Sequence, residues 1–120
     1  MRGLLIKGME VKEVQANGLE DYYRLMEIDT IDIVARKING KYYDIICDDE
    51  ALLKENPMVT VIDVDKIPMI FGNIIVAGLG DETGEMTDLT DEDIVRIIDS
   101  LRIGVLSNGI ERACLVNVDY

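Results

Sequence analysis

The dipeptide Asn39-Gly40 is the feature of this sequence that most restricts its fold. It stands between two runs rich in β-branched and aromatic residues, Ile31 to Ile38 and Lys41 to Cys47. Both central positions of a type I′ turn need a positive φ angle, which asparagine and glycine tolerate, and this turn joins two strands through only two residues. The sequence therefore predicts an antiparallel β-hairpin near the middle of the chain.

Other short apolar runs indicate further strands. Residues 3–8 and 9–16 meet at Gly8 and predict a first hairpin, with a bulge or a turn near that glycine. Residues 58–65 alternate as a half-buried strand does, and residues 73–78 form a more apolar run. These segments add two strands to the two predicted hairpins.

The longest apolar stretch, residues 67–79, is too short to cross a bilayer, which takes about 20 residues. A proline and two glycines also interrupt it, so it is predicted to be core strand. The N-terminus becomes charged again at Lys7 and lacks the sustained apolar segment of a signal peptide. We therefore expect a cytoplasmic protein that does not bind a membrane.

Two segments predict amphipathic helices. In the first, residues 17–27, Asn17 is placed to cap the helix and Glu20 to reach back to it. In the second, Thr90 is placed as the N-cap, carboxylates follow in the first turn, and an apolar pair at hydrophobic-staple spacing brackets the start. One apolar face is predicted to continue for three turns through Ile94, Ile97, Ile98, Leu101 and Val105.

The remaining segments complete an α+β arrangement. Residues 49–53 predict a turn or a helical fragment, residues 107–109 another turn, and residues 113–118 a last strand or a partner-binding tail. The order of the elements predicts one domain over residues 1–120, built as a mostly antiparallel sheet with two amphipathic helices packed on one face.

The net charge of −12 is concentrated in one part of the chain. Residues 44–93 contain 14 Asp or Glu against Lys54 and Lys66 alone, and no basic residue stands between Ile67 and Val95. Such a field repels nucleic acid and anionic lipid, and it attracts a basic protein surface or divalent cations. Direct nucleic-acid binding is therefore not expected.

The composition also excludes several catalytic chemistries. The chain has no histidine, which removes the usual general base, the usual zinc ligand and the Ser-His or Cys-His nucleophile pairs. Cys47 and Cys114 lie in apolar surroundings without ligand spacing, which is typical of buried free thiols. The sequence predicts a protein that is not an enzyme and has no cofactor.

The acidic run of residues 80–93 fits no standard ligand loop. With Gly84 at the sixth position of an EF-hand loop, Leu79 and Thr90 would occupy positions one and twelve, which need carboxylates. The preceding glycines carry acids where a phosphate loop needs bare amides or a lysine. The first-turn carboxylates have a structural explanation as helix-start residues, whereas Asp81, Glu82, Glu85 and Asp88 do not.

Three stretches resemble the domain-of-unknown-function family 3846. They are the opening GLLIKGMEVKEVQANGLED, the acidic turn at Cys47 to Glu50, and FGNIIVAGLGDETGEMTDLTDEDI at Phe71 to Ile94. The resemblance covers residues 3–103. The chain departs from the family pattern at Asn56-Pro57, where the order of the two residues is reversed. The resemblance implies an origin in phages, plasmids or other mobile elements of bacteria, and it brings no catalytic residues.

The leading hypothesis is a non-enzymatic module that binds a protein partner through an acidic surface and modulates a nucleic-acid enzyme. Charge alone suggests the partner, a protein with a basic surface. The alternative is a small-molecule or divalent-cation binding protein with a pocket at an oligomer interface. The predicted acidic surface comprises Asp81, Glu82, Glu85, Asp88, Asp91, Glu92 and Asp93.

Overall fold

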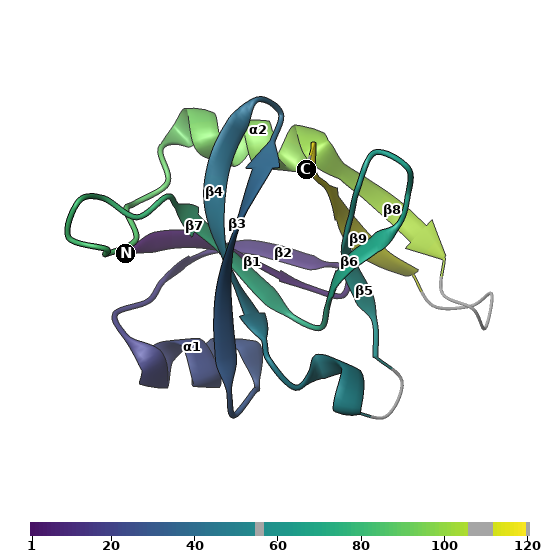
Figure 1. Ribbon diagram of the computed structural model, residues 1–120, viewed down its shortest axis with the longest axis horizontal. Coiled ribbons are helices and arrows are strands. Elements are labelled where there is room, and N and C mark those ends of the chain that lie inside the picture. The colour runs from purple at the N-terminus through teal and green to yellow at the C-terminus, as the bar shows by residue number, and fades with distance from the viewer. Residues whose placement is uncertain (55–56, 106–111, 120) are drawn as a thin grey trace.

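Strands dominate the computed structural model of the chain, which describes residues 1–54, 57–105 and 112–119. Within these residues nine strands, two α-helices and one short 3-10 helix follow one another (Figure 1). Their bounds are β1 Arg2–Lys7, β2 Glu10–Gln15, α1 Leu19–Met26, β3 Ile31–Ile38, β4 Lys41–Asp48, η1 Ala51–Leu53, β5 Val59–Ile62, β6 Pro68–Phe71, β7 Ile74–Gly78, α2 Asp91–Ser100, β8 Leu101–Val105 and β9 Arg112–Asn117.

The strands form two sheets. The first has five strands in the order β2-β1-β7-β4-β3, and the second has four in the order β6-β5-β9-β8. Among the described strands, β5 and β9 are the one parallel pair, and all other neighbours are antiparallel. The predicted α+β class with mostly antiparallel strands is confirmed, although the strands divide between two sheets.

The hairpin predicted from Asn39-Gly40 is confirmed. Strands β3 and β4 pair from Ile31 opposite Asp48 to Ile38 opposite Lys41. Asn39 and Gly40 have φ angles of 46° and 88°, as a type I′ turn requires. The Asn39 side chain donates a hydrogen bond of 2.9 Å to the carbonyl of Arg96, so the turn is also fixed against α2.

The centre of the five-stranded sheet is buried on both faces. Every residue of β7 is buried, as are the four middle residues of β1. Successive side chains of a strand point to opposite faces, so these continuous apolar runs contribute to two cores. Leu4 and Ile6 pack in one core with α2 and the second sheet, while Leu5 packs in the other with α1.

The two helices therefore cover opposite faces of this sheet, and the prediction that both pack on one face is wrong. Figure 1 shows α2 on one side of β1 and β7 and α1 on the other. Ile94 and Ile97 of α2 belong to the first core, whereas Tyr22 and Met26 of α1 belong to the second. The apolar period of each helix identifies its buried face but not the face of the sheet that it covers.

The apolar stretch of residues 67–79, predicted as core strand, forms two strands in different sheets. Gly72 has a φ angle of 86° and ends β6, after which the chain enters β7. The left-handed conformation of this glycine allows the chain to turn within an apolar segment. The change of sheet occurs at this point.

The second helix begins as predicted but ends earlier. Thr90 caps α2, and Leu89 and Ile94 are both buried around the start. The helix ends at Ser100, and residues 101–105 form β8, so the prediction that the helical face continues through Leu101 and Val105 is wrong. These residues pair with β9; the β-branched Ile103 and Val105 are compatible with a strand, and Gly104 disfavours a helix interior.

The first helix begins one residue later than its predicted cap. Gly18 is the N-cap residue. The backbone amide of Asn17 donates a 2.7 Å hydrogen bond to the Asp21 carboxylate. The prediction that Asn17 caps this helix is therefore wrong. In the part of the chain that the structure describes, no helix is long and apolar enough to span a membrane.

The C-terminal segment is a strand rather than a tail. Strand β9 lies between β5 and β8 in the second sheet. Val116 and Val118 are fully buried, so this segment contributes to the core. The turn predicted at residues 107–109 lies outside the described residues, and the helical fragment predicted at residues 49–53 is the 3-10 helix η1.

Candidate functional site

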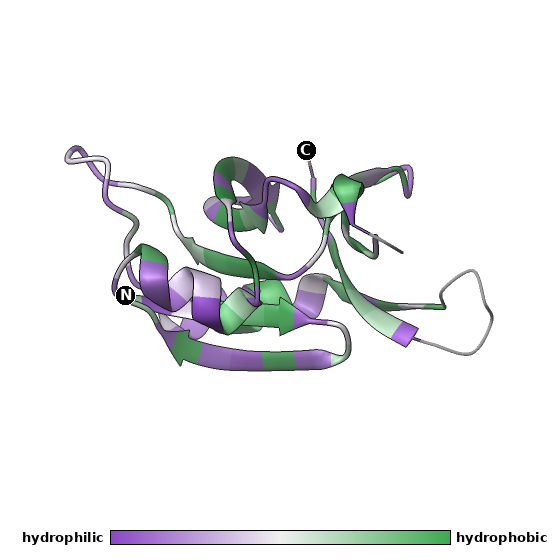
Figure 2. Ribbon diagram, turned by 90° about the horizontal axis from the view of Figure 1, so that it is seen from below, coloured by the Kyte–Doolittle hydropathy of each residue, from purple (hydrophilic) through white to green (hydrophobic). Residues whose placement is uncertain are grey.

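The loop between β7 and α2 carries most of the predicted acidic surface. The backbones of Gly78 and Thr87 exchange two hydrogen bonds of 2.9 and 3.1 Å, which close the loop at its base. Within it, the Asp81 carbonyl accepts a hydrogen bond from the Gly84 amide at 2.9 Å, and the Asp81 backbone amide donates one to the Glu85 carbonyl at 3.0 Å. Figures 1 and 2 show a hydrophilic loop that projects from the strands. Its backbone is therefore ordered before any partner binds.

The three carboxylates at the tip of this loop are Asp81, Glu82 and Glu85, and all three residues are exposed. The Asp81 carboxylate accepts hydrogen bonds from the hydroxyl and the amide of Thr83. These bonds lower the pKa of Asp81 below its usual value, because they favour the charged form. The tip therefore presents an oriented negative charge to solvent.

The next two carboxylates contact Arg2. The Asp88 carboxylate accepts from the Arg2 amide at 2.7 Å, and the Asp91 carboxylate pairs with the Arg2 guanidinium at 2.8 Å. Glu13 pairs with the same guanidinium at 2.6 Å. These contacts attach the base of the loop to β1 and partly neutralise the charge there. Of the seven predicted residues, Asp81, Glu82 and Glu85 therefore lie at the exposed tip, whereas Asp88 and Asp91 are joined to the sheet.

Asp93 does not belong to the exposed surface, because only 2% of it is accessible to solvent. It forms a capping box with Thr90 and accepts hydrogen bonds of 2.7 Å from both the Lys41 ammonium and the Tyr43 hydroxyl. Arg96 adds a contact of 3.1 Å. The prediction is corrected here: Asp93 joins α2 to β4 inside the molecule. The acidic loop surface is accordingly Asp81, Glu82, Glu85, Asp88, Asp91 and Glu92.

The contacts within this buried cluster shift the pKa values of both Asp93 and Tyr43. Burial raises the pKa of Asp93, but the hydrogen bonds, led by that from Lys41, outweigh it and hold the pKa well below its usual value. Burial, together with the hydrogen bond to Asp93, raises the pKa of Tyr43 to about 12. The carboxylate is charged and the phenol neutral at pH 7, which is the arrangement of a structural ion pair.

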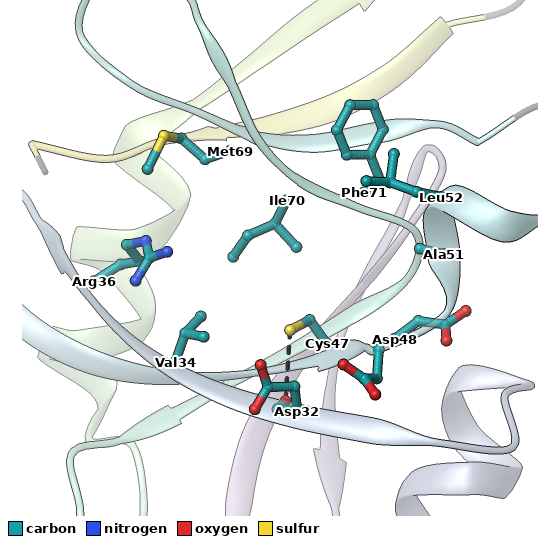
Figure 3. Close-up of a pocket in the computed structure, with 11 residues that line it drawn as sticks. Asp32, Val34, Arg36, Cys47, Asp48, Ala51, Leu52, Met69, Ile70 and Phe71 are labelled. Atoms are coloured by element: carbon teal, nitrogen blue, oxygen red, sulfur yellow. Dashed lines mark hydrogen bonds between the residues drawn. The ribbon is translucent and has the colours of Figure 1, made fainter.

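A pocket between the two sheets was not predicted. It has a volume of about 280 Å³ and opens where β3, an edge strand of the first sheet, faces β6, an edge strand of the second (Figure 3). Its lining comprises Asp32, Val34, Arg36, Cys47, Asp48, Asp49, Ala51, Leu52, Met69, Ile70 and Phe71. The alternation of Asp32, Val34 and Arg36 along β3 is the one sequence signal of this site, since it places two opposite charges and an apolar side chain on one face.

The polar groups near η1 are already engaged. The Asp48 carboxylate pairs with Lys54 at 2.6 Å, and the Cys47 thiol lies 3.5 Å from the Asp32 carbonyl, to which it donates. Burial raises the pKa of Cys47 to about 11, so the thiol is protonated at neutral pH and is a poor nucleophile. Among the described residues, no group of three or more Cys, Asp or Glu side chains is arranged to hold a metal ion.

Comparison with known proteins identifies a family. No curated protein and no solved structure matches the chain. A family model described as a domain of unknown function, DUF3846, matches residues 1–102. This match agrees with the resemblance found in the opening segment, at the acidic turn Cys47 to Glu50 and at Phe71 to Ile94, and it extends from β1 into β8. The chain therefore belongs to the DUF3846 family.

Proposed function

We propose that this protein is a non-enzymatic cytoplasmic module that binds a protein partner through its acidic loop surface. The observation that carries the proposal is the loop tip, where Asp81, Glu82 and Glu85 are exposed on a hydrogen-bonded backbone. No basic residue between Ile67 and Val95 reduces the charge of this segment. A fixed cluster of one sign attracts a basic partner over a distance and accelerates its association.

The partner that fits this charge is a protein with a basic surface. Nucleic-acid enzymes carry such surfaces where they contact phosphates, so we propose an enzyme of this class from the host or from a mobile element. Binding there would compete with the nucleic acid and so modulate the enzyme. The ordered loop backbone supports this function, because a preformed surface loses less conformational entropy on binding.

The test is retention of a partner from host lysate by the tagged protein, washed at low and then at high salt and identified by mass spectrometry. Replacing Asp81, Glu82 and Glu85 with lysine should abolish retention, because the local charge changes sign. The matched control replaces Glu20, Asp29 and Asp65 with lysine. These residues are also exposed, and the net charge changes by the same amount. It should retain the partner. Equal retention by both variants, or retention that salt does not weaken, would contradict the proposal.

A second candidate function, binding of a small molecule, is favoured by the pocket between the sheets. The pocket combines apolar walls with a few charged groups, which is typical of ligand sites.

A further inference from the structure

The pocket lies where the core between the two sheets is open to solvent. Strands β3 and β6 are both edge strands, so among the described residues no further strand continues either sheet over the opening. Val34 and Ile70 are the apolar side chains that approach from the two sheets (Figure 3). Met69 lies beside them on β6 and is partly exposed. An apolar ligand would cover these side chains and extend the core outward.

Arg36 supplies a hydrogen-bonding group that the described residues do not satisfy. Its Nη1 donates to the Ala35 carbonyl at 2.8 Å. Its Nε is buried and has no hydrogen-bond partner among the described residues. A guanidinium presents its donors in a planar fork that matches a carboxylate, and a buried donor without an acceptor destabilises the protein. An anionic group in the pocket would attract the guanidinium and offer it a charge-assisted acceptor.

The other charges of the pocket restrict the ligand to one anionic group. Asp32 lies four residues before Arg36 on the same face of β3, so their backbones are roughly 13 Å apart. Asp49 adds a second carboxylate at that end, and Asp48 is neutralised by Lys54. These carboxylates would repel a second anionic group on the ligand, which disfavours polyphosphates and dicarboxylates.

We propose that this pocket binds a small monocarboxylate with an apolar body. The carboxylate pairs with Arg36, and the body lies between Val34, Met69 and Ile70. The volume of about 280 Å³ equals roughly nine water molecules, which suits a ligand the size of octanoate. This site shares no residue with the acidic loop surface, so the proposal is independent of the proposed protein-binding function.

Calorimetric titration of the full chain with octanoate, octanamide and octylammonium at one ionic strength tests the proposal. Non-specific attraction to a protein of charge −12 would favour the cation. We expect octanoate to bind about tenfold more tightly than either of the other probes, because a charge-assisted pair with Arg36 is specific to the carboxylate. Octanoate binding that is equal to or weaker than octanamide binding would overturn the proposal.

Variants localise the effect. Arg36→Gln should weaken octanoate binding about tenfold and leave octanamide binding unchanged. Arg102→Gln is the matched control, because Arg102 is an exposed arginine on β8 that does not line the pocket. It should leave both affinities unchanged. An equal loss in the two variants would place the carboxylate elsewhere and overturn the proposal. The probe comparison in the unaltered protein decides the matter if Arg36→Gln does not fold.

Discussion

At the scale of single residues, Asp93 connects more of the structure than any other carboxylate of the acidic segment. It caps α2 and also accepts from Lys41 and Tyr43 at the start of β4. We expect Asp93→Ala to lower the free energy of unfolding by about 3–5 kcal/mol, because it leaves buried donors unpaired and removes the cap. Urea unfolding at pH 7 measures this loss.

Glu92→Ala is the matched control for that measurement. Glu92 lies in the same helical turn but is exposed, so its removal should cost less than about 1 kcal/mol. Similar losses in the two variants would show that the charge of the helix start, rather than the buried contacts of Asp93, stabilises α2.

The lowered pKa of Asp93 predicts a dependence of stability on pH. In the unfolded chain an aspartate has a pKa near about 3.9. The pKa of Asp93 in the folded protein is lower. The stability that Asp93 contributes is therefore fully present above the unfolded-state pKa and is lost as the pH falls from that value toward the folded-state pKa. Denaturant unfolding between about pH 5 and about pH 2, a range that spans the unfolded pKa, should show a steeper loss in the wild type than in Asp93→Asn. Parallel profiles would contradict this assignment.

At the scale of elements, the sequence predicts best what depends on neighbouring residues. The hairpin at Asn39-Gly40 and the cap at Thr90 are local, and the structure confirms both. The end of α2 is different, because residues 101–105 could continue the helix and become a strand only by pairing with β9. The end of a helix then depends on a strand that comes later in the chain.

The candidate sites show the same division. The exposed carboxylates of the loop tip follow from composition and from the absence of basic residues nearby. The burial of Asp93 does not, because it requires Lys41 and Tyr43 to approach from another strand. The pocket likewise requires β3 and β6, which belong to different sheets. Sequence patterns give the face of each strand but not the strand that it meets.

The attachment of the acidic loop to β7 depends on Gly78. A Cβ atom there would lie 2.7 Å from the carbonyl oxygen of Thr87, which is a backbone atom. We expect Gly78→Ala to separate the two segments, to destabilise the protein by about 1–3 kcal/mol and to speed amide exchange in the loop. Hydrogen exchange followed by NMR measures the effect.

Gly80→Ala is the control for this loop variant. A Cβ atom at Gly80 would make an ordinary contact of 3.4 Å with the Asp44 carboxylate, so the loop should keep its hydrogen bonds. Unchanged exchange at Thr87 in Gly78→Ala would mean that the loop base is not closed by this backbone pair.

At the scale of the whole molecule, the two sheets form one compact body. The radius of gyration is 13.4 Å, close to the value of about 13.6 Å expected for a single domain of this length. The first core joins residues of both sheets, including Leu4 and Ile74 from one and Val61 and Val116 from the other. The two sheets therefore share a core, and neither one can bury its apolar face alone.

This shared core predicts that the region matched by the family model is not sufficient for folding. A chain ending at Arg102 lacks all of β9 and the last three residues of β8, and the removed segment contains the fully buried Val116 and Val118. We expect this truncated chain to lose cooperative unfolding, because the second sheet loses its central pairing and the core is exposed. Val116→Ala in the full chain should instead remain cooperative and lose about 1–3 kcal/mol. Denaturant unfolding followed by circular dichroism distinguishes the two. A truncated chain with a sharp transition and an unchanged m-value would show that β9 is dispensable for the core.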